Sequence, residues 1–133
     1  FVCVDVKYSQ RLKKPVSLEE IKANPLVLYF ETAKSSISLS EEQKNTFMKI
    51  VTYMVNVEGA KCLSTGYTDN DGSNITNNRL GLKRANFAKE YLVKNGLTGS
   101  QVIAKSKGKA NPIADNNTEE GRAKNRRVVV TIK

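Results

Sequence analysis

The sequence predicts an α+β fold, written βαβαβ(β), with a mixed four-stranded sheet and two main helices packed on one face. Three features of the 133 residues support this fold class. Short apolar runs of strand length recur along the chain. Two longer segments carry helix-capping signals and apolar stripes, and each follows a predicted strand. We expect residues 1–21 to be a lead-in strand or linker and residues 22–133 to form one domain.

The composition is that of a globular domain, with 39% hydrophobic and 26% charged residues. No apolar run reaches the roughly 20 residues of a membrane-spanning helix, so we expect no span in this segment, although its parent chain could be membrane-anchored. Lysine and arginine number 22 against 13 acids, for a net charge of +9. That charge suits a polyanionic partner such as nucleic acid, anionic lipid or an acidic cell-wall polymer.

The first strand and the first main helix follow from local patterns. Residues 25–31 form a dense run of branched and aromatic residues, which predicts a central strand. After a polar loop, Ser40 is expected to begin a helix as N-cap, with Gln43 in the capping-box position. One apolar stripe on this helix consists of Phe47, Ile50, Val51, Met54 and Val55.

The remaining elements are predicted in the same way. A second strand shortly after the helix suggests a crossover that makes the first two strands parallel. The second main helix contains Gly81, where a small residue would permit close approach of backbone or ligand. The elements expected after the first helix are a strand at 60–67, a helix at 74–94, a strand at 102–107, a short helical turn at 118–124 and a strand at 127–132.

The segment from Gly66 to Ala85 carries the chemistry that we consider central. A strand ends at Gly66, a polar loop containing Asp69 follows, and the next helix carries Arg84. We therefore expect Asp69 and Arg84 to face one another across a cleft. A carboxylate binds an ammonium group and a guanidinium binds a carboxylate, so the pair would form a receptor for a zwitterion.

Three ordered blocks resemble the OmpA-like peptidoglycan-binding domain. They are Gly66-Tyr67-Thr68-Asp69, Asn77-x-x-Leu80-x-x-x-Arg84-Ala85, and the long block Asn111-Pro112-Ile113-Ala114-Asp115-Asn116-x-Thr118-x-Glu120-Gly121-Arg122-Ala123-x-Asn125-Arg126-Arg127-Val128. This family occurs in outer-membrane proteins, peptidoglycan-associated lipoproteins and flagellar stator proteins of Gram-negative bacteria. The resemblance implies a non-catalytic module without cofactor or metal. Such a module anchors a protein to the cell wall at the periplasmic face of the outer membrane.

The ligand implied by the resemblance is the peptidoglycan stem peptide, gripped at meso-diaminopimelate, by a monomer or weak dimer. The ligand residues carried over by position are Asp69, Arg84, Asn77 and Arg126, with Thr32 and Ala33 on the rim. The chain departs from the family pattern at Gly81, where serine is usual, and at Ala33, where a polar residue is common.

Several alternatives stay open on the sequence. Asp69 could be a turn residue that bonds its own loop, and Arg126 could tie the last strand to the preceding turn. A basic α/β nucleic-acid-binding domain is the rival function, although the chain lacks an aromatic-basic strand motif of the RNA-recognition type. An enzyme is disfavoured because there is no histidine and no nucleophile-base pattern. Cys3 and Cys62 could form a disulfide or be two buried thiols.

Overall fold

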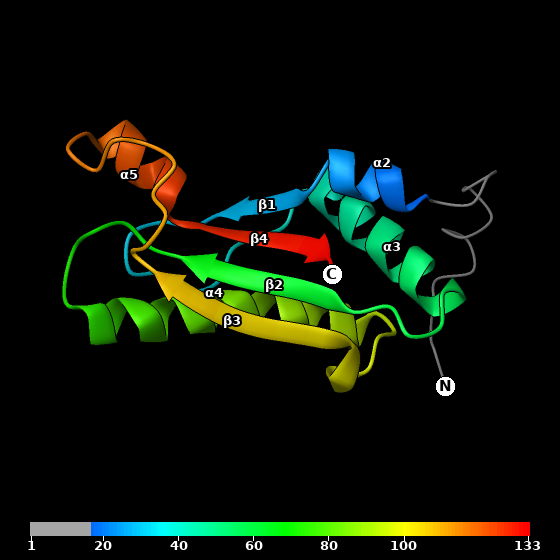
Figure 1. Ribbon diagram of the computed structural model, residues 1–133. Helices are drawn as coiled ribbons and strands as arrows, with labels where there is room; N and C mark the ends of the chain where they lie inside the picture. The colour runs from blue at the N-terminus through cyan, green and yellow to red at the C-terminus, as the bar shows by residue number, and fades with distance from the viewer. Residues whose placement is uncertain (1–16) are drawn as a thin grey trace.

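A four-stranded sheet organises the structure, a computed structural model that describes residues 17–133 (Figure 1). The strand order is β1-β4-β2-β3. β4 pairs antiparallel with both β1 and β2, and β2 pairs parallel with β3. The predicted mixed four-stranded sheet is therefore confirmed. Its strands are β1 (Leu26–Tyr29), β2 (Cys62–Tyr67), β3 (Val102–Gly108) and β4 (Arg127–Ile132).

The prediction that the first strand is central was wrong, because β1 lies at the edge of the sheet. β1 and β2 do run in the same direction, since both are antiparallel to β4, but they are not neighbours. The C-terminal strand inserts between them. This pairing joins residues about a hundred positions apart, so local sequence patterns could not reveal it.

A short helix, α2 (Leu18–Ala23), corrects the expectation of a strand or linker up to residue 21. The hydroxyl of Ser17 accepts a hydrogen bond from the Glu20 N–H at 3.1 Å and so caps the helix. The helix ends before Pro25, and its Ile21 is buried in the core. Because α2 contributes to the core, it belongs to the folded domain. The rest of the predicted lead-in, residues 1–16, lies outside the described residues.

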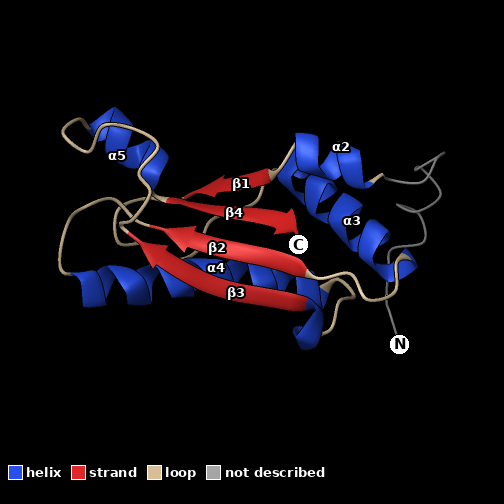
Figure 2. Cartoon of the chain, viewed as in Figure 1, coloured by secondary structure: helices blue, strands red, loops and turns tan. Residues whose placement is uncertain are grey.

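The two main helices are α3 (Glu41–Asn56) and α4 (Asn74–Lys94). The capping box between Ser40 and Gln43 is present, as predicted. Figure 2 shows α4 running behind the sheet, and the rings of Phe47 on α3 and Tyr91 on α4 lie 4.6 Å apart. Both helices thus contribute to one core. The buried residues of the predicted α3 stripe are Phe47, Ile50, Val51 and Met54, and Val55 is partly buried.

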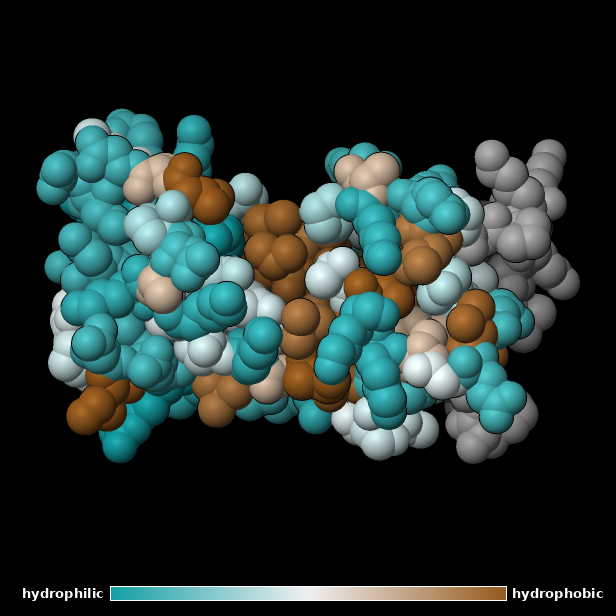
Figure 3. Space-filling model, in the orientation of Figure 1, coloured by the Kyte–Doolittle hydropathy of each residue, from teal (hydrophilic) through white to brown (hydrophobic). Residues whose placement is uncertain are grey.

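The opposite face of the sheet is not covered by α3 or α4. Figure 3 views this face, where hydrophobic side chains gather over the middle of the sheet. Alternation along the strands places partly exposed residues here, opposite the core positions. They are Val27, Leu63, Ile103 and Val129. The arrangement agrees with the prediction that the main helices lie on one face.

Gly66 on β2 and Gly81 on α4 allow the helix to lie directly against the sheet. A Cβ added at Gly66 would collide with the backbone carbonyl of Gly81, and a Cβ at Gly81 would collide with the hydroxyl of Ser106. Of the two explanations offered for a small residue at position 81, the structure supports close approach of backbone. This contact fixes the part of α4 that carries Arg84 against the end of β2.

Two short helices complete the chain: a 3-10 helix at Gly99–Gln101, and α5 (Glu119–Asn125), which is capped by the hydroxyl of Thr118. α5 confirms the short helical turn predicted there. Within residues 17–133, no helix is both long enough and apolar enough to cross a membrane. The thiol of Cys62 is buried and free, whereas Cys3 lies outside the described residues.

Candidate functional site

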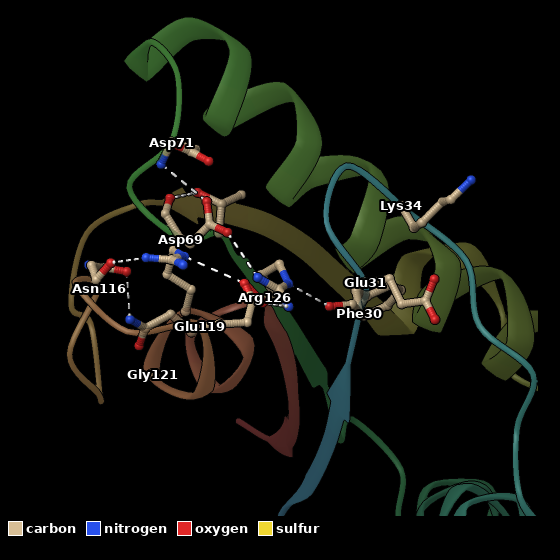
Figure 4. Close-up of polar contacts among 12 residues, drawn as sticks. Phe30, Glu31, Lys34, Asp69, Asp71, Asn116, Glu119, Gly121 and Arg126 are labelled. Atoms are coloured by element: carbon tan, nitrogen blue, oxygen red, sulfur yellow. Dashed lines mark hydrogen bonds and ion pairs between the residues drawn. The ribbon is translucent and has the colours of Figure 1, made fainter.

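The predicted site residues gather at one end of the sheet, where β1 and β2 end and β4 begins. Three connecting segments meet there: the turn after β1, the loop between β2 and α4, and α5 with its preceding loop (Figure 4). The site thus combines segments separated by about ninety residues. β4 brings them together because it pairs with β1 on one side and β2 on the other.

Asp69 lies two residues beyond the end of β2 and is 6% exposed. Its Oδ1 accepts a hydrogen bond from the Asp71 N–H at 3.1 Å, which is the bond of an Asx turn. Its Oδ2 accepts from Nη1 of Arg126 at 3.2 Å. The turn role considered for Asp69 is therefore real, and the carboxylate is in addition held by a buried cation.

Arg126 is the bridging group of the site and is 7% exposed. Besides Asp69, its Nε donates to the carbonyl of Phe30 at 2.9 Å and its Nη2 donates to Oε2 of Glu119 at 3.1 Å. It thereby ties the start of β4 to the end of β1, to the β2–α4 loop and to α5. This is the tying role that the sequence left as an alternative for Arg126.

Arg84 is the largest fully buried side chain among the described residues. Its guanidinium donates hydrogen bonds to three backbone carbonyls: Lys34 at 2.8 Å, Tyr67 at 3.0 Å and Glu31 at 3.1 Å. Desolvation lowers the pKa of Arg84 to about 10, with nearby Asp69 raising it and Arg126 lowering it further. Arg84 is therefore still a cation at neutral pH, close to Asp69 and Arg126.

The rim residues Thr32 and Ala33 lie exposed in the turn that follows β1. The Lys34 N–H donates to the Glu31 carbonyl at 3.0 Å, and Ala33 adopts a left-handed backbone with φ of 60°. Both carbonyls that flank the turn accept from Arg84. Arg84 consequently fixes the position of the predicted rim.

Asn77 is 3% exposed and lies in the first turn of α4. Its side-chain amide donates to the carbonyl of Asp71 at 2.6 Å. This bond ties α4 to the loop that carries Asp69. Asn77 thus holds the loop that carries Asp69 in place. The structure brings all four polar residues of the prediction to one end of the sheet.

Glu119 and Phe30 are site residues that sequence reasoning did not identify. Glu119 begins α5 and pairs with Arg126, while the Phe30 ring lies 5.3 Å from the Arg84 guanidinium carbon. Glu119 occupies a position that the family pattern leaves open, so the pattern carried no signal for it. Only the folded arrangement places it beside Arg126.

A groove elsewhere on the molecule does not belong to this site. It has a volume of about 470 Å³ and follows β1 between α2 and α3, and its lining includes Ile21, Tyr29 and Gln43 but none of the predicted site residues. Within the described part of the chain, no group of three or more cysteine, aspartate or glutamate side chains is placed to hold a metal ion.

The charged groups of the site are suited to recognising a ligand that carries both charges. A carboxylate and two guanidinium groups lie at the end of one sheet, beneath a turn with exposed residues. Their burial strengthens their electrostatic interactions, because little water screens them.

Comparison with known protein families gives one match that covers most of the chain. The model of the OmpA family matches residues 29–126. This range begins at Tyr29, the last residue of β1, and includes both main helices and all six predicted ligand residues. It ends at Arg126, immediately before β4.

Individual relatives agree with this match. Outer membrane protein Omp38 of Acinetobacter baumannii is 37% identical over 120 residues, which cover 90% of this chain and 33% of the relative. The peptidoglycan-binding protein ArfA of Mycobacterium tuberculosis is 45% identical over 73 residues, which cover 55% of this chain and 22% of the relative. The chain thus spans at most a third of the length of these two relatives.

A solved structure agrees as well. The peptidoglycan-associated lipoprotein of Burkholderia pseudomallei superposes with a TM-score of 0.73 at 28% identity, covering 92% of this chain and 98% of that one. The similarity therefore extends over nearly the whole of both chains.

Proposed function

Because the chain belongs to the OmpA family, we propose that it is a non-catalytic module that binds peptidoglycan and anchors its parent protein to the cell wall. Two relatives support this proposal by their names, the peptidoglycan-binding protein ArfA and the peptidoglycan-associated lipoprotein. The proposed location is the periplasmic face of the outer membrane, and the proposed state is a monomer or weak dimer.

The proposed ligand group is the free end of meso-diaminopimelate in the stem peptide. This end carries an ammonium and a carboxylate on one carbon. In the proposal Asp69 accepts the ammonium, Arg84 binds the carboxylate, and Thr32 and Ala33 border the ligand. The observation that supports it is the convergence of Asp69, Arg84 and Arg126 at one end of the sheet, with nearly complete burial of all three.

The hydrogen bonds that Arg84 already makes limit how it can bind the ligand carboxylate. A guanidinium has five N–H donors, of which three bond to carbonyls here, so two remain for a ligand. Arg84 is fully buried beneath the Glu31–Lys34 turn. We therefore propose that this turn moves when the ligand carboxylate binds, while Asp69 stays fixed by Arg126 and Asn77 holds the loop behind it.

The expected affinity for a single stem is modest. Hydrogen bonds to charged groups contribute about 1.5–3 kcal/mol each. Two such interactions, reduced by the cost of ordering the peptide, correspond to dissociation constants on the order of micromolar to millimolar. A polymeric wall presents many stems, so several copies of the domain on one envelope would hold through avidity.

Co-sedimentation with purified peptidoglycan tests the proposal. The wild-type domain should pellet with the wall, and the isosteric Asp69→Asn variant should lose most of this binding. Arg84→Lys keeps the charge but not the fork of donors, so it should also bind less. Glu90→Gln removes a charge from the exposed face of α4 and should bind like wild type. Folded variants that bind like wild type would contradict the proposed roles of Asp69 and Arg84.

A further inference from the structure

Glu119 combines an exposed position with contacts to the buried part of the site. It is the first residue of α5, and its side chain is 60% exposed. Its Oε2 lies 3.1 Å from Nη2 of Arg126, whose own side chain is only 8% exposed (Figure 4). Its Oε1 lies 3.5 Å from Nε of Arg122. Glu119 is thus the outer end of a chain of charges that leads inward to Asp69.

The net charge of the group formed by Asp69, Arg126 and Glu119 depends on Glu119. Arg126 bonds Asp69 and Glu119 at the same time, through Nη1 and Nη2. One guanidinium shared by two carboxylates leaves the group of three with a net charge of −1. If Glu119 were neutral, Arg126 would compensate the charge of Asp69 alone, and the group would be neutral.

Arg122 changes this balance only slightly. It contacts Glu119 at the longer distance of 3.5 Å and is partly exposed, so solvent screens the interaction. Its Nη1 instead donates to the carbonyl of Asn116 at 2.9 Å, which holds the loop before α5.

We propose that Glu119 is a positioning residue that sets the ligand specificity of the site: by sharing Arg126, it keeps Asp69 negative enough to prefer ligands that carry an ammonium group. This inference rests on the proposed function. It names a determinant that the family pattern does not specify, since position 119 is open in the block of residues around it. Domains with an uncharged residue at this position should discriminate less between stem peptides with and without the terminal ammonium group.

Two synthetic tetrapeptides test the inference. The first carries meso-diaminopimelate as its third residue, and the second carries 2-aminopimelate, which keeps the terminal carboxylate but lacks the ammonium. In Glu119→Gln, binding of the first peptide should weaken by about two- to fivefold, as expected for a partly exposed charge, while binding of the second stays unchanged. The preference for the ammonium should fall by the same factor.

If Glu119 had only a structural role, Glu119→Gln would weaken the binding of both peptides equally. The ratio of the two affinities is therefore the decisive readout. Glu90→Gln, which removes one negative charge elsewhere, should leave that ratio unchanged. At about 1 M salt the Debye length is near 3 Å, and the difference between wild type and Glu119→Gln should shrink.

The possible outcomes are distinct. If the wild-type domain binds neither peptide, the proposed function fails. Suppose instead that the wild-type domain binds the first peptide. If the Glu119→Gln variant then shows the same ratio of affinities as wild type, or binds the first peptide more tightly than wild type, the inference is overturned and the proposed function stands. Tighter binding would indicate that Glu119 competes with the ligand carboxylate for Arg126.

Discussion

The guanidinium of Arg126 lies 3.2 Å from the carboxylate of Asp69, and both side chains are only 8% exposed. This buried ion pair joins the start of β4 to the loop after β2, next to the fully buried Arg84. Asp69, the acid expected to bind the ligand, is thus already paired with Arg126. On the sequence alone, Arg126 could be either a ligand residue or a structural tie.

Arg126→Ala should therefore be strongly destabilising. Removing one partner leaves the buried carboxylate of Asp69 without its main compensation, which typically costs about 3–5 kcal/mol. The free energy of unfolding from urea titration measures the loss. The double variant Asp69→Asn/Arg126→Ala should regain part of it, because the buried charge is then gone. Strictly additive losses in the two single variants and the double variant would argue against a coupled pair.

Gly81→Ala should destabilise the fold even though alanine favours helices. The new Cβ meets the Ser106 hydroxyl on β3, and forcing an extra methyl into a packed contact costs about 1–3 kcal/mol. In a Ser106→Ala background the nearest obstructing atom is absent, so the same change should cost less. Thermal and urea unfolding of the wild type, the two single variants and the double variant measure the difference, and an equal cost in both backgrounds would contradict the contact described here.

The buried Cys62 thiol should be unreactive in the native state. Burial raises the pKa of Cys62 to about 12 from its ordinary value of 9.0. In a Cys3→Ser variant, iodoacetamide at pH 8 should label Cys62 only after unfolding in guanidinium chloride. Rapid labelling of the native protein would contradict the burial.

The same pKa shift predicts a pH dependence of stability. Above pH 9 the thiol ionises in the unfolded chain but stays protonated in the native state up to about pH 12. The Cys62 contribution is therefore fully present below pH 9 and is lost as the pH rises, by at most about 1.4 kcal/mol per pH unit. Cys62→Ala should lack this part of the decline, and unfolding titrations at pH 8 and 10 compare the two.

Local signals explain why most of the fold could be predicted. Ser40 with Gln43 marked the start of α3, and the apolar stripe that begins at Phe47 marked its buried face. These devices act over a few residues, so the sequence displays them directly. Ser17, which caps α2, is a signal of the same kind, but the helix that follows it has only six residues.

The features that the sequence could not predict depend on distant contacts. The edge position of β1 follows from pairing with β4 at the other end of the chain. Arg84 belongs to a residue type that is rarely buried, and the distant carbonyls of Glu31, Lys34 and Tyr67 satisfy its guanidinium in the core. The resemblance to a family predicted Asp69 and Arg84 as ligand residues, but it carried no information on the groups that Asp69 and Arg84 contact in the fold.

Calorimetric titration with two stem tetrapeptides, one bearing diaminopimelate and one bearing lysine, tests the zwitterion receptor most directly. Lysine keeps the ammonium but lacks the terminal carboxylate, so the comparison isolates the contribution of Arg84 without altering the protein. The diaminopimelate peptide should bind at least about tenfold more tightly, a difference of about 1.4 kcal/mol. Equal affinities for the two peptides, or no binding of either at millimolar concentration, would contradict recognition of diaminopimelate by Asp69 and Arg84.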